Sequence, residues 1–216
     1  MQTILVSALA AQLVLSGCQS TYYSAMEKVG YQKRDILTSR VKSAQKSQEQ
    51  AKKETKSVLE EFSKVVSYQG GDLEAQYKKM AGKLEDAEDS ADRVRRHVKE
   101  VQDVGEALFT EWKEELSLYS SPDLRAKSER QMRATRGRYD DMISAMKRAE
   151  GRLEPALKPM RDQVLFLKHN LNARAIAGIK GEVAKVDAQV TLLVNELSRS
   201  IAEADKFIKD FEANPG

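Results

Sequence analysis

The residue with the most distinctive chemistry is Cys18, the single cysteine of a 216-residue chain. It ends the sequence Leu15-Ser16-Gly17-Cys18, which closes an apolar run that starts near Thr3. A thiol can carry an acyl chain, and small residues at the end of an apolar run are typical of a site where a peptidase removes a leader. The pattern predicts a cleaved leader over residues 1–17 and a mature protein anchored by acyl chains on Cys18.

These four residues resemble a bacterial lipobox. The alternatives are a transmembrane anchor and an ordinary cleaved signal, although a run of roughly 15 apolar residues is too short to cross the roughly 30 Å hydrocarbon layer. Met1-Gln2-Thr3 departs from the pattern because secretory leaders usually begin with basic side chains. Gln19 follows the cysteine in place of aspartate, and the resemblance then implies a short lipidated tether (18–21) on the periplasmic face of a Gram-negative outer membrane.

The remaining residues carry no recognisable catalytic pattern. The histidines, His97 and His169, are preceded three positions earlier by Val94 and Phe166, so the helical di-iron pattern is missing. The chain has no H-E-x-x-H, G-x-S-x-G, P-loop or dinucleotide glycine motif. We therefore expect no enzymatic activity, no cofactor and no metal site. A net charge of +3, from 36 basic and 33 acidic residues, gives no argument for nucleic-acid binding.

The pattern along the chain predicts four long helices, over about residues 22–68, 72–119, 122–169 and 173–211. Turn signals separate them: Gly70 and Gly71 before an N-cap at Asp72, then Ser121-Pro122, and last Asn170-Leu171-Asn172. Pro155 and Pro159 each remove a backbone donor from the third helix, which predicts a kink between Gly151 and Pro159.

Apolar residues recur at heptad spacing in these stretches, as in coiled coils. The second stretch places Leu73, Met80, Ala87, Val94, Val101 and Leu108 against Tyr77, Leu84, Ala91, Val98, Gly105 and Trp112. The first uses Leu37, Ala44, Ala51, Val58 and Val65 with Val41, Gln48, Thr55 and Phe62. The fourth uses Ile176, Val183, Val190, Leu197, Ala204 and Phe211 with Ile179, Val186 and Leu193, and the third uses Tyr139, Met142, Met146, Ala149 and Leu153.

Similar helix lengths and short turns predict an all-α fold, a long antiparallel four-helix coiled-coil bundle that forms a single elongated domain over residues 22–213. The charges agree with this order, because an acidic second helix lies between two basic ones. Most charged residues are therefore expected to be solvated and paired between helices. The heptad pattern leaves the oligomeric state open, since it serves packing within and between chains equally well.

One group of basic residues falls at the same height of the predicted bundle without acidic residues at that level. This basic belt comprises Lys42, Lys46, Arg93, Arg95, Arg96, His97, Lys99, Lys147 and Arg148. It is a candidate site for an anionic partner, such as a lipid head group or an acidic glycan. The alternative is an ordinary basic surface whose counter-charges lie elsewhere around the bundle.

A second candidate lies at the end of the bundle far from the lipid. Residues 163–173 are apolar on all sides over Val164-Leu165-Phe166-Leu167. The candidate tip dock for a protein partner comprises Phe166, Lys168, His169, Asn170 and Asn172. The alternative is a well-packed tip that closes the core, with His169 in a turn hydrogen bond.

Three segments, 23–30, 106–112 and 163–173, resemble the family of Gram-negative lipoproteins called domain of unknown function 2959. The resemblance covers nearly all of the mature chain. It implies a periplasm-facing helical lipoprotein and carries no catalytic residue or ligand to this sequence. The sequence as a whole favours a non-enzymatic spacer, scaffold or adaptor that contacts other envelope proteins; the alternative is a binding module for an anionic envelope lipid or glycan.

Overall fold

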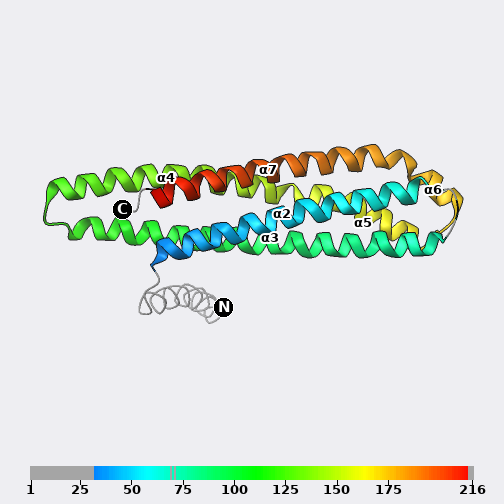
Figure 1. Cartoon of the computed structure of the whole chain (residues 1–216), viewed down its shortest axis with the longest axis horizontal. Coiled ribbons are helices and arrows are strands. Elements are labelled where there is room, and N and C mark those ends of the chain that lie inside the picture. The colour runs from blue at the N-terminus through cyan, green and yellow to red at the C-terminus, as the bar shows by residue number, and fades with distance from the viewer. Residues whose placement is uncertain (1–31, 69, 71, 214–216) are drawn as a thin grey trace, which may run out of the picture.

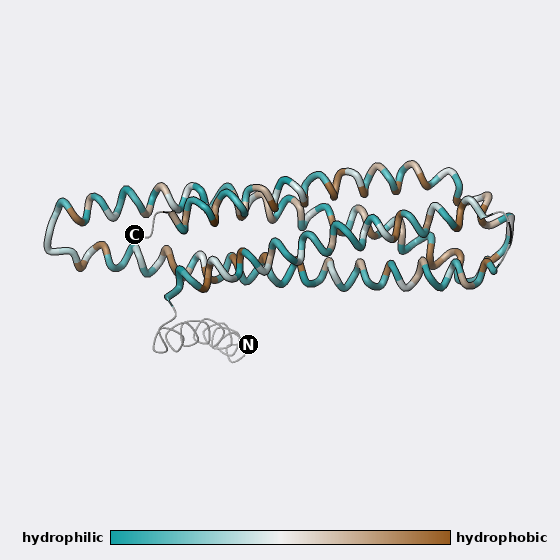
Figure 2. Tube along the Cα trace, in the orientation of Figure 1, coloured by the Kyte–Doolittle hydropathy of each residue, from teal (hydrophilic) through white to brown (hydrophobic). Residues whose placement is uncertain are grey.

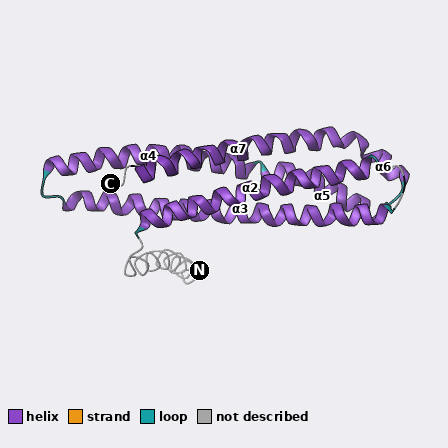
Figure 3. Cartoon of the chain, viewed as in Figure 1, coloured by secondary structure: helices purple, strands orange, loops and turns teal. Residues whose placement is uncertain are grey.

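The computed structural model describes residues 32–68, 70 and 72–213, and this part of the chain consists of helices and short turns (Figure 3). The α-helices are α2 (Lys33–Val66), α3 (Leu73–Glu115), α4 (Pro122–Gly151), α5 (Leu153–His169), α6 (Ala173–Ile179) and α7 (Val183–Ala213), with 3-10 turns η1 (Leu116–Leu118) and η2 (Lys180–Glu182). The predicted leader and tether lie outside the described residues, as does the expected start of the first helix at residue 22. The all-α prediction is confirmed.

The helices lie lengthwise beside one another and form an elongated bundle (Figure 1). α2 packs against α3 and α7, and α4 and α5 pack against both α3 and α7. Ion pairs fix the register of the first two helices: Lys33 contacts Glu111 at 2.9 Å, and Lys79 contacts Glu61 at 3.1 Å. With 43 residues, α3 alone is about 65 Å long at 1.5 Å per residue.

Polar side chains start three of the helices, and the sequence predicts two of these caps. Asp72 accepts a hydrogen bond from the Ala75 amide at the start of α3 (2.9 Å), and Ser121 accepts one from the Leu124 amide at the start of α4 (3.4 Å). Asn172 caps α6 in the same way, which confirms the predicted turn at residues 170–172. These caps satisfy amide donors that the first turn of a helix leaves unpaired.

Three predicted helices are interrupted or end early. The second predicted helix, α3, changes from α to 3-10 geometry at Leu116. The third predicted helix breaks into α4 and α5 at Arg152, within the predicted kink interval. Pro155 falls in the first turn of α5, where a missing donor costs little, so the break lies before this proline and Pro159 remains inside the helix. The fourth stretch was expected to be continuous, but η2 interrupts it beside Gly181, a residue with low helix propensity.

The heptad residues form the core, and apolar residues alternate with hydrophilic ones along the helices (Figure 2). All nine predicted residues of α2 are buried, including Gln48, whose side-chain oxygen accepts a hydrogen bond from the Ser200 hydroxyl of α7 at 3.0 Å. In α3 the buried position moves from Leu108 to Phe109 toward the end of the helix. A straight helix drifts by about 20° per heptad, so a different residue faces inward after several repeats.

Gly105 provides the space for the largest fully buried side chain. The ring of Tyr139 lies directly over it, and its hydroxyl reaches the Val101 carbonyl at 3.3 Å. Phe109 and Phe207 pack on the same ring, with centroids 5.3 Å and 6.2 Å away. Burial raises the pKa of the Tyr139 hydroxyl, which therefore stays protonated. This aromatic cluster joins α3, α4 and α7.

The α3–α4 hairpin extends beyond the other helices at one end of the bundle (Figure 1). α2 begins at the level of Glu111, and α7 ends beside α2, where the Arg34 guanidinium lies 4.1 Å from the centre of the Phe211 ring. Of the described residues, only those of α3 and α4 continue past this level, joined by η1 and the turn at residues 119–121. We call this part, residues 112–131, the protruding hairpin.

Candidate functional site

The basic belt predicted from the sequence surrounds the bundle at its middle and does not form a single patch. Lys42 faces α7, where it contacts Glu212 at 2.9 Å, whereas Arg95 faces α5 and lies 3.7 Å from Glu154. Arg148 faces α7 from the other side, 3.9 Å from Glu196. The members therefore share a height but point into different grooves between helices.

Acidic partners lie closer to several belt residues than the sequence reasoning assumed. His97 lies 3.2 Å from Glu100, and Lys99 lies 2.9 Å from Asp103 on the next turn of α3. Arg93 donates a hydrogen bond to the Ser90 hydroxyl instead. Among the described residues, the belt members without an acidic or hydroxyl partner in the structure are Lys46, Arg96 and Lys147, all of them exposed.

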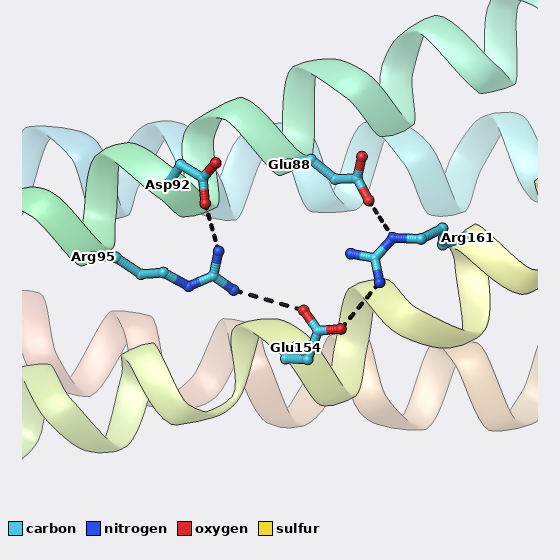
Figure 4. A network of polar contacts seen from close by, with 5 residues as sticks. All are labelled: Glu88, Asp92, Arg95, Glu154 and Arg161. Atoms are coloured by element: carbon cyan, nitrogen blue, oxygen red, sulfur yellow. Dashed lines mark hydrogen bonds and ion pairs between the residues drawn. The ribbon is translucent and has the colours of Figure 1, made fainter.

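Arg95 belongs to a network of ion pairs that fastens α5 to α3 (Figure 4). Arg161 donates to Glu88 at 2.6 Å and to Glu154 at 3.0 Å, and Arg95 contacts Asp92 at 2.5 Å. The hydrogen bond from Arg161 lowers the pKa of Glu154, and the two carboxylates raise the pKa of Arg161. These groups are half-exposed, so the network sets the position of α5 after the break at residue 152 and adds little stability.

The tip dock residues lie at the end of the bundle opposite the protruding hairpin (Figure 1). Phe166 is 45% exposed and Leu165 is 60% exposed, whereas Leu167 is fully buried. Lys168 and His169 are exposed in the last turn of α5. The apolar segment thus has one side chain in the core and two at the surface, and its proposed role as a dock stays a prediction.

Two of the predicted dock residues make contacts that hold the turn together. The Asn170 amide donates a hydrogen bond to the Phe166 carbonyl at 2.9 Å, and Asn172 caps α6. Within the described residues, the side chain of His169 makes no hydrogen bond, whereas a bond in the turn was the alternative interpretation. Of the dock candidates, Phe166, Lys168 and His169 are therefore the side chains available to a partner.

A sequence profile described as Protein of unknown function (DUF2959) matches residues 22–211. The chain belongs to this family. The resemblance seen in its three segments is thereby confirmed, and the DUF2959 region includes residues 22–31, which precede the described helices. No curated protein matches the chain, and no solved structure matches it.

Two further properties of the described helices concern membrane insertion and metal binding. Among the described residues of this DUF2959 protein, none of the helices is both long and apolar enough to span a membrane. Within the same residues, histidine, cysteine and carboxylate side chains nowhere gather in threes as a metal site would require. Cys18 lies outside the described residues, so its predicted modification remains a prediction.

The sequence reasoning missed a groove on the protruding hairpin. This hairpin groove has a volume of about 710 Å³ and is lined by residues that include Trp112 from α3 and Leu124 from α4. The indole of Trp112 donates to the Ser128 hydroxyl at 2.9 Å, which joins the two helices. Leu118 at the end of the hairpin is 80% exposed. Apolar residues directly beside the Ser121-Pro122 turn were the signal that could have revealed this surface.

Proposed function

We propose that this DUF2959 protein is a non-enzymatic lipoprotein, anchored through Cys18 to the periplasmic face of the outer membrane, that acts as a spacer, scaffold or adaptor. The observation that carries this proposal is the rod itself. A core runs from Leu37 to Leu167 along the bundle, and each end exposes large apolar side chains, Leu118 at the protruding hairpin and Phe166 at the opposite tip. A stiff rod with exposed apolar side chains at each end is suited to holding a partner at a fixed distance from a membrane.

The finer architecture belongs to the same proposal: an antiparallel four-helix coiled coil. Most heptad positions are buried in each long helix, and the pairing of Lys33 with Glu111 and of Lys79 with Glu61 supports opposite directions for α2 and α3. Interdigitated side chains along such a seam resist bending, which a spacer needs.

The anchor is tested by metabolic labelling with an alkyne fatty acid in cells that express the full-length chain. Labelling is expected for the wild type and lost in Cys18→Ser. Release of Cys18→Ser from the outer-membrane fraction is expected as well, because several acyl chains at about 0.8 kcal/mol per buried methylene supply the membrane affinity. An unlabelled wild-type protein contradicts the anchor.

The scaffold role is tested by site-specific crosslinking in intact cells. A photoreactive residue at Phe166 samples the exposed tip, and one at Lys185 on the flank of α7 provides a control on another exposed surface. A discrete product formed from position 166 and not from position 185 supports a tip-docked envelope protein. Identical patterns from the two positions contradict an adaptor role for the tip.

The alternative function, a module for an anionic envelope lipid or glycan, rests on Lys46, Arg96 and Lys147. These belt residues are exposed at a common height. Each basic residue near an anionic membrane surface contributes about 1 kcal/mol, so the three together are worth about 3 kcal/mol, or roughly a hundredfold in affinity.

Sedimentation with phosphatidylglycerol vesicles, with and without lipopolysaccharide as competitor, tests this alternative. Replacing these three residues by glutamine should reduce binding at low salt by roughly a hundredfold. The control replaces three basic residues elsewhere on the rod, Lys56, Lys78 and Lys185, by glutamine. Equal losses in both variants, or no binding by the wild type, contradict a belt site.

A further inference from the structure

The hairpin groove is open in the described part of the chain, and the chain itself supplies a segment that fits it. The groove is lined by apolar side chains from both helices of the hairpin, including Leu108, Trp112 and Leu124. Gln32 and Lys33, at the beginning of α2, line the same groove. The described part of α2 therefore begins at the edge of the groove.

We propose that residues 22–31 occupy the hairpin groove and continue the packing of α2 along the protruding hairpin. This inference concerns the segment between the proposed lipid anchor and the first described helix. The DUF2959 match begins at residue 22, so the segment belongs to the matched domain and not to the leader.

The spacing of the segment's apolar residues supports this occupant. Tyr22, Met26 and Val29 fall at steps of four and three residues, and the next steps of four and three reach Lys33 and Ile36. Lys33 faces α3 through its contact with Glu111, and Ile36 is buried. Residues at these steps share one face of a helix, so the apolar stripe continues the face with which α2 contacts α3.

The segment is long enough to span the uncovered surface. Eleven residues from 22 to 32 extend about 16 Å as a helix, and α3 with η1 continues about 11 Å beyond Glu111 before the turn. The register of Lys33 with Glu111 then brings residue 22 to the level of the turn at residues 119–121. The segment would cover the groove from one end to the other.

The start of α2 and the local charges agree with this path. α3, α4 and α6 each start at a residue whose side chain caps the helix, whereas Gln32 makes no capping hydrogen bond with its side chain. Continuing the register places Glu27 near the level of Lys127, which lines the groove. An acidic side chain at that level is matched in charge.

The proposed docking has a consequence that rests on the proposed anchor. With residues 22–31 in the groove, only four residues, 18–21, separate the lipid from the turn of the hairpin. The protruding hairpin would then face the membrane, with the exposed Leu118 and Tyr119 nearest to it, and Phe166 would lie at the far end of the rod.

Disulfide formation in the full-length chain tests the docking. The test pair is Met26→Cys with Glu115→Cys, which places one thiol in the segment and one at the groove. The control pair is Met26→Cys with Lys113→Cys, which places the second thiol at a similar height on the opposite side of α3. Each pair is introduced with Cys18→Ser, so that the new thiols are the only ones. The expected result is an intramolecular disulfide for the Glu115 pair and none for the Lys113 pair.

The single tryptophan gives a second readout, because Trp112 lines the groove. Met26→Asp with Val29→Asp should shift its emission to longer wavelength and increase its quenching by acrylamide in the purified full-length protein. Ser24→Asp with Lys28→Gln changes the charge equally on the other side of the segment and should leave both unchanged. Circular dichroism confirms that each variant retains its helices.

The other outcomes overturn the proposal. A disulfide between two chains identifies a second copy as the occupant of the groove. The segment does not fill the groove if the disulfide forms equally with both α3 positions or with neither. The same conclusion follows if Trp112 of the wild type is quenched as easily as Trp112 of the Met26→Asp, Val29→Asp variant. Because both readouts work without the lipid, their failure is distinct from a failure of fatty-acid labelling at Cys18.

Discussion

Replacing Gly105 by alanine should destabilise the bundle, although alanine is the better helix former. In an exposed helix interior this change gains about 1 kcal/mol. At Gly105, however, the new methyl group would lie closer than 3.0 Å to three atoms of the Tyr139 ring. Forcing an extra methyl group into a packed core costs about 1–3 kcal/mol.

The ring of Tyr139 has little freedom to move aside. Phe109 and Phe207 pack on it, and its hydroxyl is bonded to the Val101 carbonyl, so a shift would disturb all three contacts. Taking the overpacking cost near its upper value and subtracting the helix gain leaves a net loss of about 1–2 kcal/mol. For a domain of this size that corresponds to a fall in Tm of roughly 2–8 °C.

Gly82 provides the matched control on the same helix, because nothing lies within 4 Å of a Cβ placed there. Gly82→Ala should raise Tm, by roughly 1–4 °C. Thermal unfolding followed by circular dichroism measures both, and a double-mutant cycle with Tyr139→Leu tests the cause. In the Tyr139→Leu background Gly105→Ala should cost little; a Gly105→Ala protein as stable as Gly82→Ala would refute the reasoning.

Three further predictions concern single contacts. Burial opposes ionisation of Glu61, but hydrogen bonds with Lys64 and Lys79 outweigh this effect and lower the pKa of Glu61 in the folded protein. The ionised side chain therefore contributes to folding stability above about pH 4.3, the pKa of an unperturbed glutamate. This contribution is lost as the pH falls through the lower pKa of the folded state. Glu61→Gln should therefore be less stable at pH 7 and lose less stability on acidification, as urea titrations at several pH values would reveal. Asn172→Ala should cost about 1 kcal/mol through the lost α6 cap, with Asn172→Asp retaining most of it; equal Tm losses would exclude capping. Leu167→Ala should lower the free energy of unfolding in urea by about 2–5 kcal/mol, because Leu167 is fully buried. Phe166→Ala should lower it by under about 0.5 kcal/mol, because Phe166 is exposed. Similar losses for the two variants would contradict the burial pattern.

The sequence predicted the fold well where local signals and periodicity agreed. Asp72 and Ser121 marked helix starts because a side-chain cap is a local interaction. The seam of α2 was also predicted correctly, including the buried Gln48, because the period of a helix fixes which residues share a face. The interruption at η2 was missed, since Gly181 is a weak signal beside a continuous apolar repeat.

The candidate sites were predicted less well because they depend on contacts between distant segments. Register alone placed the belt residues at one height, but it did not give their directions around the bundle. The partners Glu154 and Glu212 come from other helices, so these contacts of Arg95 and Lys42 were invisible in the local sequence. The pairing of Arg95 with Asp92, three residues earlier on α3, was a local signal that the sequence reasoning overlooked. The hairpin groove was missed for a related reason, since it exists only because α3 and α4 continue past α2 and α7.

The pairing of α2 with α7 has a consequence for how the protein is made. Arg34, Gln45 and Gln48 of the first described helix contact Phe211, Asp205 and Ser200 of the last one. These contacts cannot form before the final residues have been synthesised, and α2 has many small and polar residues on its inner face. A chain that lacks α7 therefore leaves α2 packed against α3 alone, and the core can close only after α7 has been synthesised.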